Sequence, residues 1–205
     1  MKIDAATAIG ATDRTVRPAD RDGQGVYEVE SRRRFSTSQA DLWDAISSAE
    51  RLPRWFLPVS GELREGGRYQ LEGNASGTIL RCEAPRLLSV TWEYGGGMSW
   101  LDVTLEPVAE DVTLLRLVHV VPDDDHWRQF GAGATGVGWD LGLLGLALHA
   151  EGGGSAVAAE GAAWAASPEG LDYMRQCAEA WREAHVRSGA PESSSCPPGS
   201  RLTLA

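Results

Sequence analysis

The sequence predicts an α+β protein in which an antiparallel sheet packs against a long buried helix. Three observations lead to this fold class. From residue 61 to 121, apolar and polar residues alternate in short runs separated by turn-forming residues, as in strands. Gly136–Ala150 is the most apolar stretch and repeats with a helical period. Ser167-Pro168-Glu169 is a strong helix-start signal: a cap residue, a proline and an acid.

Residues 1–25 are mostly polar, and we expect an N-terminal arm with a short strand at Arg14–Arg17. The first clear strand is Val26–Phe35, whose inner face carries Ser31 and Arg33 among apolar residues. The Arg32-Arg33-Arg34 triplet is therefore split across two faces. This split favours a solvated strand edge with one partly buried Arg33 over an anion site.

Two short helical segments follow the first strand. Ser38–Ser47 begins with a cap residue and carries Leu42, Trp43 and Ile46 at helical spacing. A second helical turn covers Glu50–Trp55 and ends in the apolar plug Trp55-Phe56-Leu57-Pro58. The acidic face of these helices has none of the character of a DNA-recognition helix.

The alternating region predicts a meander of antiparallel strands. Its turns contain Gly66-Gly67, Pro85-Arg86, Gly95-Gly96-Gly97 and Ala109-Glu110-Asp111. The strands between them are Arg68–Glu72, Gly73–Ala84, Leu87–Tyr94, Met98–Val108 and Val112–Val121.

Gly136–Ala150 is predicted to be the central helix. At about 1.5 Å per residue it is roughly 20 Å long, too short for a ~30 Å hydrocarbon core. Its polar side chains are limited to Asp140 and His149. Gly138, Gly142 and Gly145 lie on one stripe, which should face either a cavity or a closely packed neighbour.

The composition narrows the classes of partner. The 205 residues are 42% apolar and 23% charged, with a formal net charge of −10, which disfavours nucleic acid and anionic membranes. The three cysteines make no CxxC pair, and the N-terminus lacks an apolar core of signal-peptide length. We therefore expect a cytoplasmic protein without membrane insertion. We also expect the domain to span 26–187, with an extra helix at 168–188, and a disordered tail at 189–205.

Motifs for catalysis are scarce. The chain has no GxSxG, HExxH or Walker sequence. Asp123-Asp124-Asp125-His126 favours a loop and helix cap over a metal site, because adjacent side chains diverge. Cys82, alternating inward with Leu80, is expected to be a small core residue. We expect neither a cofactor nor a metal.

The order of elements resembles the START-like, or SRPBCC, helix-grip superfamily. Leu42-Trp43-Asp44-Ala45 and the segment Glu50–Pro58 are similar to the branch named after activators of the heat-shock protein 90 ATPase. Gly66-Gly67-Arg68-Tyr69 and Val90-Thr91-Trp92-Glu93 match later strands of that branch. Gly136–His149 resembles the long helix of an actinobacterial subgroup. The resemblance covers about residues 26–187.

The resemblance implies a curved sheet wrapped around the long helix, with a cavity between them for lipids, sterols, polyketides or other apolar molecules. A concave apolar site is also what the residues suggest unaided. Whether the cavity is open or filled by the core stays undecided. Arg33 and His119 are the polar groups that could orient a ligand. The candidate lining consists of Trp55, Phe56, Tyr69, Leu71, Leu88, Val90, Trp92, Tyr94, Val103, Leu117, His119, Trp139 and Leu143.

Three functions are compatible with the sequence. The leading one is non-enzymatic binding of a small apolar molecule, with modulation of a protein partner. The second is a co-chaperone that stimulates a chaperone ATPase through its surface. The third is a cyclase, dehydratase or hydrolase using His119, which would need an acid or base within roughly 3 Å. For His119, a hydrogen-bonded core role is favoured over catalysis. The sequence leaves monomer and dimer open.

Overall fold

The predicted strands form one curved antiparallel sheet. The computed structural model describes residues 3–153 and 156–189, and in these residues the sheet has eight strands in the order β1-β2-β8-β7-β6-β5-β4-β3. All neighbours in this order pair antiparallel. The strands are β1 (Thr12–Arg21), β2 (Gln24–Phe35), β3 (Val59–Gly61), β4 (Arg68–Leu71), β5 (Ser76–Glu83), β6 (Leu87–Tyr94), β7 (Gly97–Ala109) and β8 (Val112–Pro122).

The first strand is longer than the sequence predicts. β1 pairs with β2 from Thr12↔Arg33 to Arg21↔Gln24, whereas the sequence indicates only Arg14–Arg17. The turn between these strands places Asp22 and Gly23 at positive φ. Val16 is the one strongly apolar residue of β1 that is buried, so the alternation is hard to recognise. A helix, α1 (Ala5–Gly10), precedes the strand and is capped by Asp4.

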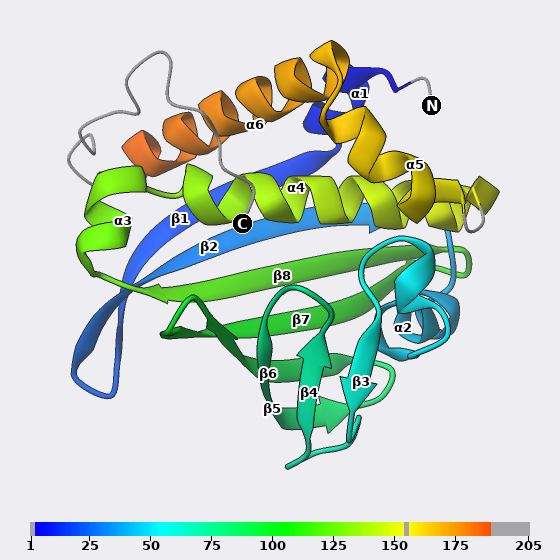
Figure 1. The fold of residues 1–205 in the computed structure, drawn as a ribbon, viewed down its shortest axis with the longest axis horizontal. Helices are drawn as coiled ribbons and strands as arrows, with labels where there is room; N and C mark the ends of the chain where they lie inside the picture. The colour runs from blue at the N-terminus through cyan, green and yellow to red at the C-terminus, as the bar shows by residue number, and fades with distance from the viewer. Residues whose placement is uncertain (1–2, 154–155, 190–205) are drawn as a thin grey trace.

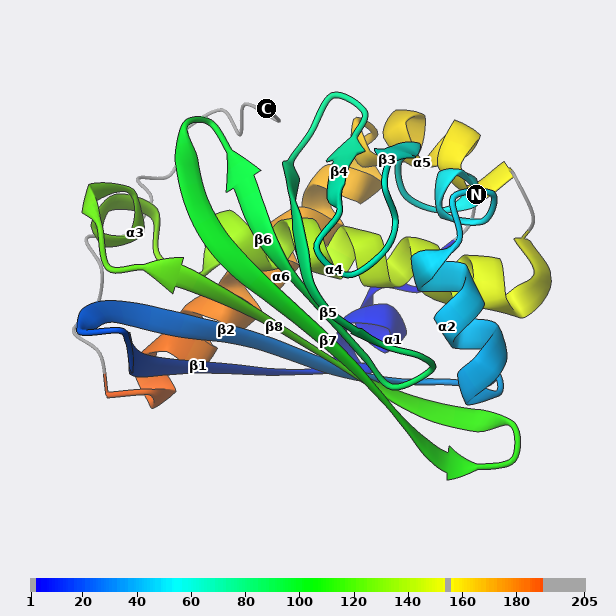
Figure 2. The same ribbon diagram turned by 90° about the horizontal axis from the view of Figure 1, so that it is seen from below.

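The helices gather mainly on one face of the sheet. After β2 come α2 (Gln39–Ser47), capped by Ser38, and the 3-10 turn η1 (Leu52–Arg54). After β8 come α3 (Asp125–Phe130), α4 (Gly133–Leu148), the π-helical turn η2 (His149–Gly153), α5 (Ala156–Ala165) and α6 (Pro168–Arg187). In Figure 1, α4, α5 and α6 lie over the sheet and α2 lies near β3 and β4. Figure 2 shows the sheet from below, with α4 and α6 behind it.

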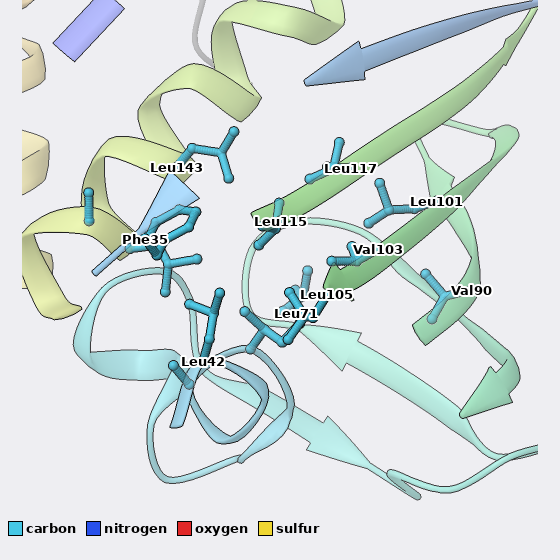
Figure 3. Close-up of a cluster of buried hydrophobic side chains, with 14 of the residues drawn as sticks. Phe35, Leu42, Leu71, Val90, Leu101, Val103, Leu105, Leu115, Leu117 and Leu143 are labelled. Carbon is cyan, nitrogen blue, oxygen red and sulfur yellow. The ribbon is translucent and has the colours of Figure 1, made fainter. Parts of the chain in front are cut away.

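Helix α4 contributes to two hydrophobic cores. The first core joins buried residues of α2 and β4 to β8 with Leu143, Leu146 and Ala147 of α4 (Figure 3). The second core joins residues of β1, β2 and α6 with Val137 and Leu144 of α4. This arrangement confirms the predicted helix-grip fold and explains why α4 is apolar on most sides.

A buried ion pair ties the second core together. The Arg14 Nη2 and Asp140 Oδ1 atoms lie 2.9 Å apart, and both side chains are almost fully buried. The indole nitrogen of Trp181 donates to Asp140 Oδ2 at 2.9 Å. Asp140, one of the two polar residues of the apolar stretch, therefore connects β1, α4 and α6. The predicted tail lies, except for Gly189, outside the described residues.

Candidate functional site

A cavity of about 150 Å³ lies within the first core, between α4, the η1 segment and the inner face of β4 to β8. Figure 3 shows Leu71, Val90, Val103, Leu117 and Leu143 reaching from these elements toward a shared interior. The cavity brings together most of the predicted lining: Trp55, Phe56, Tyr69, Leu71, Leu88, Val90, Trp92, Val103, Leu117, Trp139 and Leu143. The strand alternation therefore identified the inner face of β4, β6, β7 and β8 correctly.

Four aromatic rings form one wall of the cavity. The rings of Trp55 and Phe56 stack with centroids 5.4 Å apart, and Phe56 stacks on Trp139 at 6.4 Å. Trp92 meets Trp139 edge-to-face at 5.1 Å. The lining from β7 and β8, together with Ile79 of β5, is instead aliphatic. A flat apolar ring would therefore find aromatic contacts on one side and branched aliphatic contacts on the other.

Three polar groups of this lining, those of Trp55, Tyr69 and Ser47, bond away from the cavity or along the backbone. Trp55 Nε1 donates to the Ala45 carbonyl at 2.9 Å, and the Tyr69 hydroxyl donates to the Thr91 carbonyl at 2.7 Å. Burial raises the pKa of Tyr69 well above its ordinary value, so the phenol stays protonated. The Ser47 hydroxyl donates to the Trp43 carbonyl at 2.7 Å. The surface left for a ligand is therefore largely apolar.

His119 is buried beside the cavity and does not line it. Its ring contacts Trp92 and Trp139, which do. Trp139 Nε1, which can only donate, lies 2.9 Å from His119 Nδ1. The imidazole proton must then sit on Nε2, which donates to Ser99 Oγ at 2.7 Å. The Ser99 hydroxyl in turn donates to the Trp92 carbonyl at 3.2 Å.

This geometry makes His119 a neutral structural residue. Burial lowers the pKa of His119 to about 4, so the ring carries no charge near neutral pH. Both ring nitrogens are engaged, one by an indole and one by a hydroxyl. The acid or base partner that the catalytic hypothesis requires is not among these partners. The hydrogen-bonded core role favoured by the sequence agrees with these contacts.

Known proteins share both the sequence pattern and the fold. Residues 36–149, more than half of the chain, match the family described as activator of Hsp90 ATPase homolog 1-like protein. The chain belongs to this family. The resemblance in the α2 and η1 segments is thereby confirmed. Among curated proteins, no relative matches the chain.

Solved structures of similar proteins extend the match over nearly the whole domain. The solution structure of CalU16 from Micromonospora echinospora is 32% identical, with a TM-score of 0.73 over 88% of this chain and 97% of that one. Its crystal structure gives 31% identity and a TM-score of 0.68 over 85% and 98%. EF2215 from Enterococcus faecalis has a TM-score of 0.63 over 86% and 92%, and at 19% identity it shows the fold alone.

Two predicted lining residues of this family member lie elsewhere. Tyr94 is 41% exposed, because it pairs with Gly97 in the last register position before the β6–β7 turn. Tyr94 keeps the same alternation as Leu88, Val90 and Trp92, but β6 extends at this end beyond the cavity. His119 faces inward as predicted, but it packs against Trp92 and Trp139, which line the cavity in its place. Neither residue belongs to the lining.

Cys82 is at the rim of the cavity and is not a small core residue. The pairing of β5 with β6 shifts between Ile79 and Arg81, so Leu80 forms a bulge and is 38% exposed. After the bulge, Cys82 pairs with Leu88 and shares its inward direction. The thiol is nevertheless exposed, because β5 ends near the open edge of the cavity.

The sequence missed lining residues from the short helices, the short strand and the loop that follow β2. Side chains from α2, η1, β3 and the following loop close one end of the cavity; these are Ile46, Ser47, Leu52, Val59 and Leu63. Elements this short show no clear periodicity that would indicate which face points inward. The sequence therefore identified lining residues only in the neighbouring apolar plug, Trp55-Phe56-Leu57-Pro58. Of the other additions, Leu101, Leu115, Gly142 and Leu146 lie on faces that were predicted to point inward. Ile79 lies on the face of β5 opposite to the predicted one, because the alternation shifts at Leu80.

The glycine stripe of α4 meets three different environments. Gly142 lines the cavity, and a β-carbon there would lie 3.8 Å from Phe56. A β-carbon on Gly145 would come within 2.7 Å of the Trp55 carbonyl oxygen, so this glycine permits close backbone packing. Gly138 faces open space. Both predicted roles of the stripe therefore occur, at different residues.

Arg33 lies at a different place from the one expected for a ligand-orienting group. It is only 8% exposed and is not among the cavity lining. Among the described residues, no group of three or more His, Cys, Asp or Glu side chains could hold a metal ion. In the same part of the chain, no helix is long and apolar enough to cross a membrane.

Proposed function

We propose that the protein binds a small apolar molecule in the first-core cavity and does not transform it chemically. The observation that carries this proposal is the combination of an apolar cavity with polar groups that bond elsewhere. Burial of apolar ligand surface would supply the affinity, at roughly 25 cal/mol per Å² before the costs of binding. Membership of the activator of Hsp90 ATPase homolog 1-like family is compatible with this role.

The size of the cavity limits the ligand. Its volume of about 150 Å³ is below the 300–1,000 Å³ typical of ligand pockets. An apolar cavity of this volume in another protein holds benzene. A ligand that enters without rearrangement is therefore one small ring or a branched aliphatic group of similar size. A larger ligand must displace part of the wall. We expect the segment carrying Trp55 and Phe56 to move, because it follows the short turn η1 and belongs to neither the sheet nor a long helix.

The proposal is tested with 4-bromotoluene, whose bromine quenches indole emission on contact. We expect saturable quenching, because Trp55, Trp92 and Trp139 line the cavity. Gly142→Leu should abolish it by filling the cavity from α4. Gly138→Leu is the matched control, since the same side chain there enters open space. Equal quenching of both variants and the wild type would overturn the proposal. Native mass spectrometry of the protein purified from its source organism is an independent test, which should detect a retained ligand if the proposal is correct.

A second candidate is stimulation of a chaperone ATPase through the protein surface. The family description, which names this activity, is the observation that favours it. The test is the ATPase rate of a purified Hsp90-type chaperone with increasing amounts of the protein. Saturable stimulation that persists in Gly142→Leu would support a surface activity separate from the cavity. An unchanged ATPase rate with a folded protein would exclude it.

A further inference from the structure

The inner face of β2 carries a buried positive charge that the protein does not neutralise by direct contact. Arg33 is 8% exposed, and its Nη1 atom is fully buried without a hydrogen bond. In residues 3–153 and 156–189, Arg33 forms no ion pair. Its guanidinium carbon lies 5.7 Å from the ring centre of Phe35. Buried charges in proteins are normally paired, because desolvation of a lone ion is costly.

The buried carboxylate of α4, Asp140, is already occupied. Asp140 accepts from Arg14 Nε and Nη2 and from Trp181 Nε1. Arg14 belongs to the same buried layer, because it pairs in register with Ser31 while Thr12 pairs with Arg33. The layer between β1, β2 and α4 therefore contains two guanidinium groups and one carboxylate. Among the buried groups this leaves an excess of one positive charge, and the carboxylate of Glu151, which also acts electrostatically on Arg33, is exposed to solvent.

A second unsatisfied group lies next to Arg33. Ser31 is 1% exposed, and its hydroxyl has no hydrogen-bond partner. Ser31 and Arg33 are two residues apart on one strand, so their side chains leave the same face about 6.5 Å apart. A single ion lying between the two side chains would accept a hydrogen bond from each. The Tyr173 hydroxyl, whose electrostatic interaction with Arg33 is the strongest among its charged or ionisable neighbours, faces the same region.

We propose that Arg33 and Ser31 bind one small monovalent anion, of the halide type, between β2 and α4. The anion neutralises the excess charge and accepts hydrogen bonds from the guanidinium and the hydroxyl. Burial also lowers the pKa of Arg33 from its ordinary value, which agrees with a guanidinium in need of a counter-charge. The site is separate from the apolar cavity, whose lining includes neither residue. The sequence favoured a solvated strand edge over an anion site for the arginine triplet. In our proposal its middle residue, Arg33, binds an anion on the buried face.

The test measures thermal unfolding while sodium bromide replaces sodium gluconate at constant ionic strength. We expect the wild-type Tm to rise by roughly 3 to 5 °C for each tenfold increase of bromide above its dissociation constant. Arg33→Met should lose this response, and in gluconate it should be at least as stable as the wild type. Ser31→Ala should shift the response to about tenfold higher bromide. Arg34→Met, an exposed position on the other face of β2, is the matched control and should respond like the wild type.

Diffraction supplies an independent readout. Crystals grown in bromide should show an anomalous peak within hydrogen-bond distance of Arg33 Nη1 and Ser31 Oγ. A water molecule there, with a Tm independent of bromide, would overturn the proposal. The proposal would also be overturned if bromide left the wild-type Tm unchanged while Glu151→Gln changed the Tm in gluconate as much as Arg33→Met does. Glu151, which raises the pKa of Arg33 electrostatically, would then be the counter-charge. If Arg33→Met does not fold, Ser31→Ala and the anomalous peak still decide the question.

Discussion

The two cores that meet at α4 solve opposite packing problems with the same helix. In the first core, α4 presents Gly142, Leu143 and Leu146 to a cavity whose walls are apolar. In the second core, it presents Gly136 and Asp140 to Trp181 of α6, with almost no free space. One side of the helix thus leaves room, and the other side is tightly packed and charged.

The difference lies in how each core satisfies its polar groups. In the first core, the indoles of Trp55 and Trp139 and the phenol of Tyr69 bond to backbone carbonyls or to His119 and leave an apolar surface. In the second core, Arg14, Asp140 and Trp181 bond to one another across three elements. We infer that the second core holds α4 rigidly in place, so that the first can tolerate an unfilled volume. The predictions below test this division of roles.

The largest effect is expected for Asp140→Asn in the second core. Removing this carboxylate leaves Arg14 buried without its counter-charge, which typically costs about 3 to 5 kcal/mol. Urea unfolding of the wild type and the variant measures this loss. Asp172→Asn is the matched control, because Asp172 pairs with Arg175 on the exposed side of α6 and should matter little. Similar losses of unfolding free energy for the two variants would contradict the conclusion that Asp140 links β1, α4 and α6.

A pH effect of nearly that size is expected from His119 at the edge of the first core. The folded-state pKa of His119 is about 4, below the ordinary value of 6.5. Between these values the unfolded chain binds a proton that the folded protein does not, so stability falls as pH falls. The loss from pH 6.5 to pH 4 is about 3 kcal/mol. Urea unfolding across this range should show a smaller pH slope for His119→Gln, and an unchanged slope would refute the burial argument.

The two glycines that face the two cores provide the next comparison. A β-carbon on Gly136 would lie 2.2 Å from the Trp181 ring, whereas one on Gly142 would lie 3.8 Å from Phe56. Gly136→Ala should cost about 1 to 3 kcal/mol through overpacking. Gly142→Ala should be neutral or stabilising by up to about 1 kcal/mol, because alanine favours helix. Thermal unfolding of both variants checks the order, and the reverse order would mean that the tight and open sides of α4 are misassigned.

The parts of the fold with a period could be predicted from the sequence. Alternation places Val90, Val103 and Leu117 on the inner face, and the helical period of the apolar stretch identifies α4. The same rules fail where geometry departs from the period. The bulge at Leu80 reverses the alternation before Cys82, and β6 continues past the cavity at Tyr94.

Long-range pairing left no signal in the sequence. Arg14 and Asp140 are 126 positions apart, and each alone resembles an ordinary charged residue. The alternation in β2 predicts that Arg33 is partly buried, but it does not reveal the neighbours of Arg33 on α4 and α6, Asp140 and Tyr173. The tautomer of His119 follows only from the position of Trp139 Nε1. Chemical roles in this protein are therefore set by contacts between elements, whereas the local sequence pattern defines only the elements themselves.

The smallest expected effects come from two helix caps, one for each core. Ser38 accepts from the Asp41 amide at the start of α2, and Ser167 accepts from the Gly170 amide at the start of α6. Ser38→Ala and Ser167→Ala should each cost about 1 kcal/mol. Their effects on 4-bromotoluene binding should differ, however. Helix α2 supplies Ile46 to the lining and the Ala45 carbonyl that holds Trp55, whereas α6 supplies no lining residue.

Ser38→Ala should therefore weaken quenching by 4-bromotoluene, and Ser167→Ala should leave it unchanged at the same loss of stability. Measuring both quantities on both variants separates a local effect on the cavity wall from a global effect on the fold. If Ser167→Ala weakens binding as much as Ser38→Ala does, the two cores are coupled through α4. The packing of the second core would then also affect ligand binding in the first.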